Sequence, residues 1–477
     1  MALHQNLIAG EWTGGDAIPN INPSDTNEIV GEYARGTADD MKNAIAAAKA
    51  AFPAWSRSGI LERHAILRKT SDEILARKDE LGALLSREEG KTLPEGISEV
   101  IRAAQIFDFF AGETLRLTGE LVPSARPGIG VEITRDPLGV IGIITPWNFP
   151  IAIPAWKIAP ALCYGNTVVF KPAELVPGSA WAIVDILNRA GLPKGVLNLV
   201  MGKGSVVGQV MLDSPDLSGL TFTGSTGTGK RVALASIEHN RKFQLEMGGK
   251  NPFVVLDDAD LTVAVEAAAN SAFFATGQRC TASSRIIVTE GIHNRFVEAL
   301  TARLSGLNVD HAMKQGTHIG PVVDPSQLKQ DEDYIEIGKS EGAKLVIGGG
   351  RIERDTPGYY LAPALFTEAT NQMRISREEI FGPVASVIRV KNYDEALATA
   401  NDTPFGLSSG IATTSLKYAT HYKRNAEAGM VMVNLPTAGV DFHVPFGGRK
   451  GSSFGSREQG KYANEFFTTV KTAYTLA

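Results

Sequence analysis

The chain has little cysteine, no marked excess of either charge and no long apolar run, and each shortage excludes a class of protein. Only Cys163 and Cys280 occur in 477 residues, which excludes a disulfide framework and favours a reducing compartment. The net charge of −5 gives no electrostatic reason to expect a nucleic-acid partner. No apolar stretch approaches the roughly 20 residues of a membrane span, and the N-terminal residues do not resemble a signal peptide. We therefore expect a cytoplasmic protein.

The length predicts more than one domain, because single hydrophobic cores rarely serve more than about 250–300 residues. Short strands are expected in the first 35 residues, and helices at 38–55 and 95–113. From "PLGVIGIIT" to "GLTFTG", apolar runs of strand length alternate with helical segments, which indicates a buried parallel sheet of the dinucleotide-binding kind. A second α/β series runs from "NPFVVL" to "GMVMVN", so a cleft is expected between two α/β units.

The tail "FFTTVKTAYT" is rich in β-formers and has no obvious partner inside the chain. We expect it to pair with another part of the fold or, more specifically, to add to a sheet of another subunit.

The stretch "FTGSTGTGKRV" has most of the glycine pattern of a P-loop, beginning at Gly224. A P-loop needs Ser or Thr after its lysine to ligate Mg²⁺, and here Arg231 follows Lys230. A nucleoside triphosphatase is therefore disfavoured, although a glycine-rich turn at a helix start still suits a phosphate group.

The two cysteines lie in different surroundings. Cys163 falls within the apolar segment "APALCYGN" and is interpreted as a buried hydrophobic residue. Cys280 follows Gly277 and Arg279 and opens a polar stretch, "RCTASSR". A neighbouring cation favours thiolate, so Arg279 is expected to lower the thiol pKa and Cys280 is a candidate nucleophile.

Further motifs strengthen this interpretation: "TPWNFP", "QLEMGGKNP" and "EEIFGPV". Together with "KPAE", "FTGS", "GQRC" and "PFGG", they resemble the motifs of the aldehyde dehydrogenase superfamily, in that family's order and over essentially the whole chain. The resemblance implies an α/β fold without a metal site. It implies a Rossmann-type NAD-binding domain (residues 1–119 and 138–249), an α/β catalytic domain (250–450) and a small β arm (120–137 and 451–477) that forms a homodimer or tetramer.

The chemistry of such an enzyme gives each motif a role. An aldehyde attacked by the Cys280 thiolate becomes an oxyanion, which needs fixed donors. By resemblance these are the Asn148 amide and the Cys280 backbone N–H. Hydride transfer leaves a thioester, and Glu246 is the family's base for its hydrolysis. Lys157 matches a family lysine near the cofactor and a possible proton path. A non-catalytic relative would be expected to lose Cys280, Asn148 or Glu246, and the chain retains all three.

The resemblance also implies a set of cofactor contacts. A carboxylate at Glu174 would bind the ribose hydroxyls of NAD and repel the 2′-phosphate of NADP, so NAD is expected, with NADP still possible. The cofactor residues implied are Trp147, Lys171, Glu174, Gly224, Ser225, Glu379 and Phe381.

The family's substrate tunnel maps to mostly apolar positions and two arginines. Those arginines suit a clamp for a substrate carboxylate, and an internal ion pair is the alternative for Arg102. The loop "LPTAGVDFHVPFGG" and "GQRCTASSR" look most like α-ketoglutaric semialdehyde dehydrogenases, with succinate semialdehyde or broad-specificity enzymes as alternatives. Glu246 favours release of the free acid rather than of acyl-CoA. The implied substrate residues are Arg102, Phe149, Trp156, Phe274, Arg279, Thr281 and Phe446.

Overall fold

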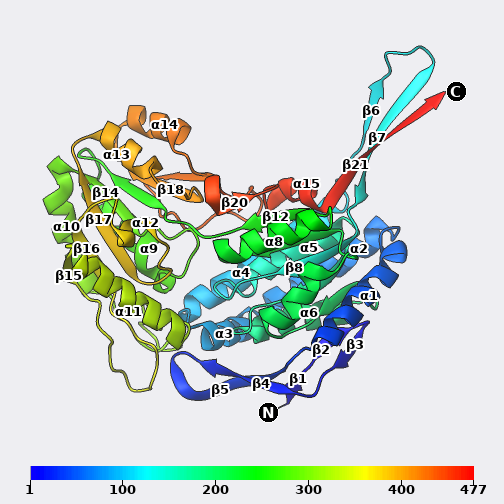
Figure 1. Cartoon of the computed structure of the whole chain (residues 1–477), viewed down its shortest axis with the longest axis horizontal. Helices are drawn as coiled ribbons and strands as arrows, with labels where there is room; N and C mark the ends of the chain where they lie inside the picture. The colour runs from blue at the N-terminus through cyan, green and yellow to red at the C-terminus, as the bar shows by residue number, and fades with distance from the viewer. Residues whose placement is uncertain (1, 477) are drawn as a thin grey trace.

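Two large sheets, each covered by helices on both faces, make up most of the computed structural model, which describes residues 2–476 (Figure 1). The first has eight strands in the order β20-β12-β11-β8-β9-β10-β2-β3, and its five central strands are parallel. These are β8 (Val140–Ile144), β9 (Thr167–Lys171), β10 (Leu197–Leu199), β11 (Gly219–Thr223) and β12 (Lys242–Glu246), flanked by β2 (Asn6–Ile8), β3 (Glu11–Thr13) and β20 (Ser453–Phe454).

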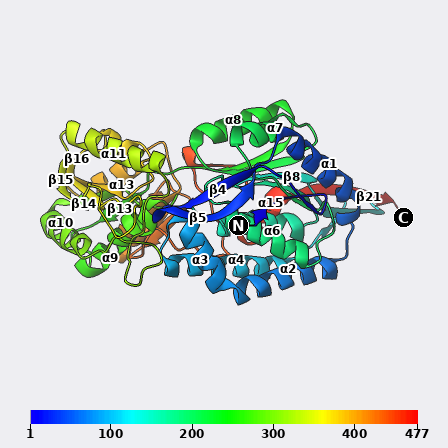
Figure 2. The same ribbon diagram turned by 90° about the horizontal axis from the view of Figure 1, so that it is seen from below.

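Side chains of the central strands point alternately to two helical layers. In β9, Val168 and Phe170 pack on one side and Val169 on the other. Figure 2 shows one layer formed by α1, α7 and α8 and the opposite one by α2, α3, α4 and α6. Their bounds are α1 (Ala38–Trp55), α2 (Ile60–Ala76), α3 (Lys78–Glu89), α4 (Leu93–Glu113), α5 (Ala152–Cys163), α6 (Pro177–Arg189), α7 (Gln209–Asp213), preceded by the π-helical turn η1 (Gly204–Gly208), and α8 (Thr226–Glu238).

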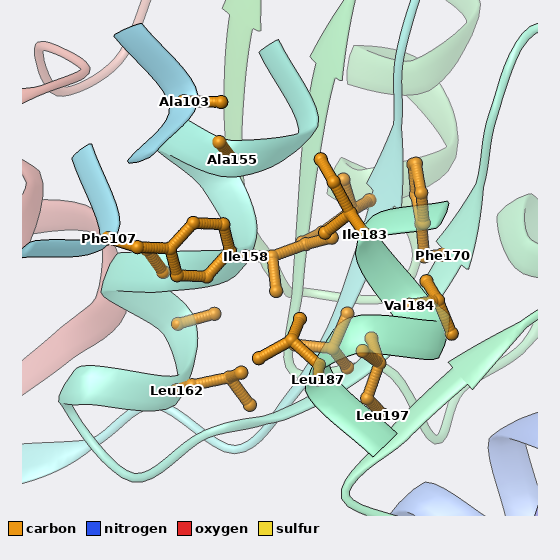
Figure 3. Close-up of a cluster of buried hydrophobic side chains, with 14 of the residues drawn as sticks. Ala103, Phe107, Ala155, Ile158, Leu162, Phe170, Ile183, Val184, Leu187 and Leu197 are labelled. Carbon is orange, nitrogen blue, oxygen red and sulfur yellow. The ribbon is translucent and has the colours of Figure 1, made fainter. Parts of the chain in front are cut away.

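The core beneath α4 is built by helices that were expected from the sequence, whereas α2 and α3 were not. Phe107 of α4 and Ile158 of α5 meet Leu187 of α6 there, as Figure 3 shows. The sequence did not predict helix α2, because its buried face includes the polar residues Arg63 and Thr70 and so lacks a regular helical spacing of apolar residues. No helix within residues 2–476 combines the length and the apolar composition that a membrane crossing requires.

The second sheet has seven strands in the order β15-β16-β17-β14-β13-β18-β19, all parallel except β15. Its strands are β13 (Pro252–Val255), β14 (Arg285–Thr289), β15 (Lys344–Ile347), β16 (Ala364–Ala369), β17 (Val384–Val390), β18 (Ser408–Ala412) and β19 (Met430–Val433). Its helices are α9 (Leu261–Phe273), α10 (Glu290–Ser305), α11 (Pro325–Ser340), α12 (Arg374–Arg377), α13 (Tyr393–Asn401) and α14 (Leu416–Asn425).

Two small sheets complete the fold. The first pairs β1 (Leu3–His4), β5 (Asp25–Ala34) and β4 (Ala17–Asn22), and the second pairs β21 (Thr468–Leu476), β7 (Ile129–Pro137) and β6 (Glu120–Pro123). The sheet of β21, β7 and β6 projects from the body as an arm (Figure 1). Strand β21 pairs with β7 along its whole length, which confirms the expectation that the tail pairs with another part of the fold, whereas its addition to a sheet of another subunit stays a prediction. The partner was not obvious because it lies more than 300 residues away in the sequence, where local patterns carry no information.

Candidate active site

The parallel strands of the eight-stranded sheet bring most of the predicted residues to one edge. Asn148 follows the carboxyl end of β8, Lys171 ends β9, Ser225 follows β11 and Glu246 ends β12. Because parallel strands end on the same side, these residues lie in the crevice where open α/β sheets bind ligands.

Cys280 comes from the other sheet's side, after a strained turn. In the 3₁₀ turn η2 (Phe274–Gly277), Ala275, Thr276 and Gly277 have consecutive φ values of 49°, 58° and 66°. The Ala275 N–H donates to Glu95 Oε1 (3.0 Å) and the Thr276 hydroxyl to the Gly320 carbonyl (3.2 Å). A Cβ on Gly277 would lie 2.2 Å from the Gly382 oxygen, so only glycine fits there. The turn therefore fixes the backbone that presents Cys280.

The Cys280 thiol has a high proton affinity rather than a low one. Burial, together with the charges of Glu246 and Glu379, raises its pKa to about 12, against the influence of the N–H groups of Thr281 and Cys280. The prediction of a lowered thiol pKa is wrong, although the charges of Arg279 and Cys280 do interact. The Arg279 guanidinium donates to the carbonyls of Phe274 (2.9 Å) and Asn270 (3.0 Å).

Asn148 is oriented as an oxyanion donor requires. Its buried Nδ2 donates one hydrogen to the Gln278 carbonyl (3.0 Å), which leaves the second amide hydrogen free. The Cys280 backbone N–H has no backbone carbonyl acceptor within residues 2–476. Two N–H groups, one on Cys280 itself and one on the side chain held to Gln278 two residues earlier, thus remain without an acceptor among the described residues.

An ion pair that the sequence reasoning missed holds the Asn148 segment. The buried Lys91 donates to Glu99 Oε2 (2.7 Å) and to the Asn148 carbonyl. The other oxygen of Glu99 accepts from the N–H groups of Ile151 and Ala152, both at 3.1 Å. The sequence did offer a signal for this pair, since a positive charge just before the apolar helix α4 and a negative charge in its second turn would each be costly if unpaired.

Glu246 is fully buried and lies in a network of polar groups. Ser453 donates to its Oε2 (2.5 Å). Burial and the nearby Glu458 raise the pKa of Glu246 well above its usual value, against the influence of Ser453 and Lys157. Lys157 donates to Glu458 and, at 2.7 Å, to the Thr221 hydroxyl. Sequence reasoning missed Glu458, which makes Lys157 part of a buried acid–base cluster rather than an isolated cation.

The residues at the sheet edge fit a dinucleotide. Ser225 caps α8, and the exposed residues that follow it leave helix N–H groups available to a pyrophosphate. Lys171 is buried, its pKa is lowered by burial, and it forms no ion pair with any described carboxylate. Glu174, three residues on, is exposed and able to reach a ribose.

Glu379 and Phe381 come from the segment between α12 and β17 and contact the segments that follow β12 and β8. Glu379 Oε1 accepts from the Gly249 N–H (2.8 Å), and burial raises its pKa to about 7. Phe381, with a φ of 66°, packs edge-to-face on Trp147 at 5.4 Å. Gly224 lies between β11 and α8, and its N–H donates to the Glu246 carbonyl (3.0 Å), which holds this turn against the end of β12.

A cavity of about 540 Å³ opens at Cys280, and it contains most of the predicted substrate residues. Phe274 is the exception, because its neighbour Ala275 forms the wall instead. Additional wall residues on α4, not singled out from the sequence as pocket residues, include Ser98, Ile101 and Gln105. The predicted residues that line the cavity are Arg102, Phe149, Trp156, Arg279, Thr281 and Phe446.

The two arginines that line the cavity differ in their hydrogen-bond partners. Arg102 donates through Nη2 to Gln459 Oε1 (3.0 Å) and lies 5.8 Å from the Trp156 ring. Neither Arg102 nor Arg279 forms an ion pair within residues 2–476, so the alternative of an internal ion pair for Arg102 is wrong. Burial lowers the pKa of both, yet each guanidinium stays charged at neutral pH. Arg102 has the more open guanidinium, because Arg279 is held by backbone carbonyls.

Comparisons with known proteins agree with this geometry. Residues 12–473 match the aldehyde dehydrogenase family. The α-ketoglutaric semialdehyde dehydrogenase of Bacillus subtilis (strain 168) is 46% identical over 474 residues, 98% of this chain and 97% of that protein. The 2,5-dioxopentanoate dehydrogenase of Saccharolobus solfataricus is 40% identical over 479 residues, 99% of each. The structure of betaine aldehyde dehydrogenase from Staphylococcus aureus in complex with NAD+ has a TM-score of 0.97 at 33% identity, covering 99% of this chain and 95% of that chain. This chain belongs to the aldehyde dehydrogenase family of NAD(P)-dependent enzymes.

Proposed function

We propose that the protein oxidises α-ketoglutaric semialdehyde to 2-oxoglutarate with NAD. The observation that carries the proposal is Arg102, a half-buried residue with a buried Nε that forms no ion pair with any described carboxylate and lines the same cavity as Cys280. A partly desolvated cation of this kind is costly unless an anion joins it, and the carboxylate of the substrate is such an anion. The 46% identical relative named for this activity supports the assignment.

In the first step the Cys280 sulfur forms a bond to the aldehyde carbon while its proton passes to a base. A base is needed because the thiol pKa is raised to about 12. Glu246 lies close enough for its charge to influence that pKa, and it is our candidate acceptor. The carbonyl oxygen becomes an oxyanion and accepts from the free hydrogen of Asn148 and from the Cys280 N–H.

A nicotinamide dinucleotide held here would supply the oxidation as the hydride acceptor, and the acyl group would then stay on Cys280 as a thioester. The residues that would hold the dinucleotide are Lys171 and Glu174 at the adenosine ribose, Ser225 at the pyrophosphate and Glu379 at the nicotinamide ribose. The exposed Glu174 carboxylate favours NAD, since it would repel a 2′-phosphate.

Before the last step Glu246 gives up the proton that it took from the thiol, and Glu458, whose charge raises the Glu246 pKa and which accepts a hydrogen bond from Lys157, is the next acceptor on the proton's way out. Glu246 then takes a proton from water, the water oxygen attacks the thioester carbon, and the bond to Cys280 breaks. The raised pKa of Glu246 suits it to these proton transfers near neutral pH.

The arm supports a homo-oligomer. Its outer strands β6 and β21 have unpaired edges, and its exposed apolar side chains include Leu121 (84% exposed), Val470 (60%) and Tyr474 (62%). An unprotected edge of this kind invites pairing with another chain. Light scattering should give a mass of two or four chains, and a mass of one chain would contradict this part of the proposal.

A panel of aldehydes, assayed by the absorbance of reduced cofactor with NAD and NADP in parallel, tests the substrate. We expect the highest kcat/KM for α-ketoglutaric semialdehyde, a lower value for succinate semialdehyde and the lowest for hexanal. A preference for hexanal would overturn the substrate assignment and leave the aldehyde dehydrogenase chemistry intact.

A further inference from the structure

Gln459 has a backbone conformation that a residue with a side chain rarely adopts. Its φ of 62° and ψ of 167° fall in a region that essentially only glycine populates. The side chain is fully buried, and its Nε2 has no acceptor among the described residues. Such strain persists only where the surroundings enforce it, and it is common at functional sites.

The neighbours of Gln459 enforce this conformation. Glu458 exchanges both backbone hydrogen bonds with Phe446, at 2.8 and 2.9 Å, and its carboxylate accepts from Lys157. Phe446 itself stacks on Trp156 at 5.3 Å. Glu458, directly before Gln459, is thereby anchored both to the proton network through its side chain and to the cavity wall through its backbone.

The Gln459 side chain emerges from this anchored backbone toward Arg102. Its Oε1 accepts from Arg102 Nη2 at 3.0 Å. Arg102 Nε is buried without an acceptor, and the nearest acids that raise its pKa, Glu99 and Asp441, form no ion pair with it. Gln459 is therefore the only side chain within residues 2–476 that accepts a hydrogen bond from this guanidinium.

We propose that Gln459 is a positioning residue that orients Arg102 to bind the substrate carboxylate. The inference rests on the proposed function. A neutral carbonyl holds the guanidinium in place and leaves its charge uncompensated, so that the charge is available to an incoming carboxylate. A carboxylate at position 459 would neutralise Arg102, and a hydrocarbon side chain would leave it free to turn away.

The experiment compares Gln459→Met and Gln459→Glu with the wild type. The readout is the ratio of kcat/KM for α-ketoglutaric semialdehyde to kcat/KM for hexanal, which a merely structural role would not move. We expect Gln459→Met to lower this ratio about tenfold and Gln459→Glu to lower it further. Gln372→Glu makes the same charge change at an exposed position far along the chain and should leave the ratio unchanged.

A double mutant shows whether Gln459 acts through Arg102. In an Arg102→Ala background, Gln459→Met should lower the ratio no further, because the residue that it positions is gone. If Met does not fold at this position, Gln459→Gly suits the backbone angles and removes the same side chain. An unchanged ratio in the single variants, or an equal fall without Arg102, would overturn this inference alone. A wild-type ratio near one would overturn the proposed substrate as well.

Discussion

The paired lysines and the unpaired arginines of the site differ in how their charges are compensated. The buried Lys91 is paired with Glu99 at 2.7 Å and the buried Lys157 with Glu458, and both pairs hold other groups of the site in place. Arg102 and Arg279, both half-buried, line the cavity without an ion-pair partner among residues 2–476. A buried ion pair holds neighbouring groups in position, whereas a cation that is partly removed from water without an anion is costly until a ligand supplies that anion. The difference separates the machinery that positions the chemistry from the residues that recognise the substrate.

Removing the proposed base, Glu246, should have the largest effect. We expect Glu246→Gln to slow thioester hydrolysis by about 10²- to 10⁴-fold, because the amide cannot take the proton from water. Rapid-mixing kinetics should show a burst of reduced cofactor, itself slowed because Glu246 also accepts the thiol proton, followed by still slower turnover. An equal fall of the burst rate and the steady rate would refute the role in deacylation.

Breaking a pair and removing a lone cation should differ in stability. Lys91→Met leaves the Glu99 carboxylate buried without a cation and should lower the free energy of unfolding by about 3–5 kcal/mol. Arg102→Met removes an uncompensated charge and keeps the hydrocarbon stem, so a change of no more than about 1 kcal/mol is expected. Denaturant unfolding of the two variants measures both. Similar losses in both variants would mean that Arg102 has a structural role.

The thiol's proton affinity can be followed by alkylation. With a pKa of about 12, the thiolate fraction of Cys280 rises with pH throughout the neutral range. The rate of iodoacetamide labelling should therefore climb about tenfold per pH unit from about pH 7 to about pH 9, with no plateau. Cys280→Ala should remove the labelling. Glu246→Gln should speed labelling at a given pH, because it deletes a charge that raises this pKa. A plateau below about pH 8 would indicate a stabilised thiolate.

The smallest effect is expected at the cofactor. Glu174 is exposed, so solvent screens its repulsion of a 2′-phosphate. Glu174→Ser should narrow the preference for NAD over NADP by about 10-fold or less. The ratio of kcat/KM for the two cofactors measures this effect. An equal or better kcat/KM for NADP in the wild type would contradict the assignment of Glu174.

Short sequence motifs identified Asn148, Lys171, Ser225 and Glu246 through their resemblance to the family. These motifs follow or end parallel strands, so the fold carries their residues to a common edge of the sheet. The sequence could not locate groups whose role depends on a distant partner. Glu458 meets Lys157 across 301 residues, and β21 finds β7 only in the folded chain.

The net effect of the surroundings on the thiol was equally hidden from the sequence. Arg279 adjoins Cys280 in the chain and its charge interacts with the thiol, although its guanidinium donates to Asn270 and Phe274. Burial and the charges of Glu246 and Glu379 raise the thiol pKa nevertheless, and these carboxylates come from distant parts of the chain.

The contrast between Arg102→Ala and wild type on charged and neutral aldehydes tests the central claim most directly. A charge-assisted hydrogen bond is worth about 1.5–3 kcal/mol, so kcat/KM for α-ketoglutaric semialdehyde should fall about 10- to 150-fold. Hexanal, which has no carboxylate to lose, should be oxidised nearly as well as before. Equal losses on both aldehydes, or no loss on the semialdehyde, would contradict the claim that this unpaired arginine recognises the substrate.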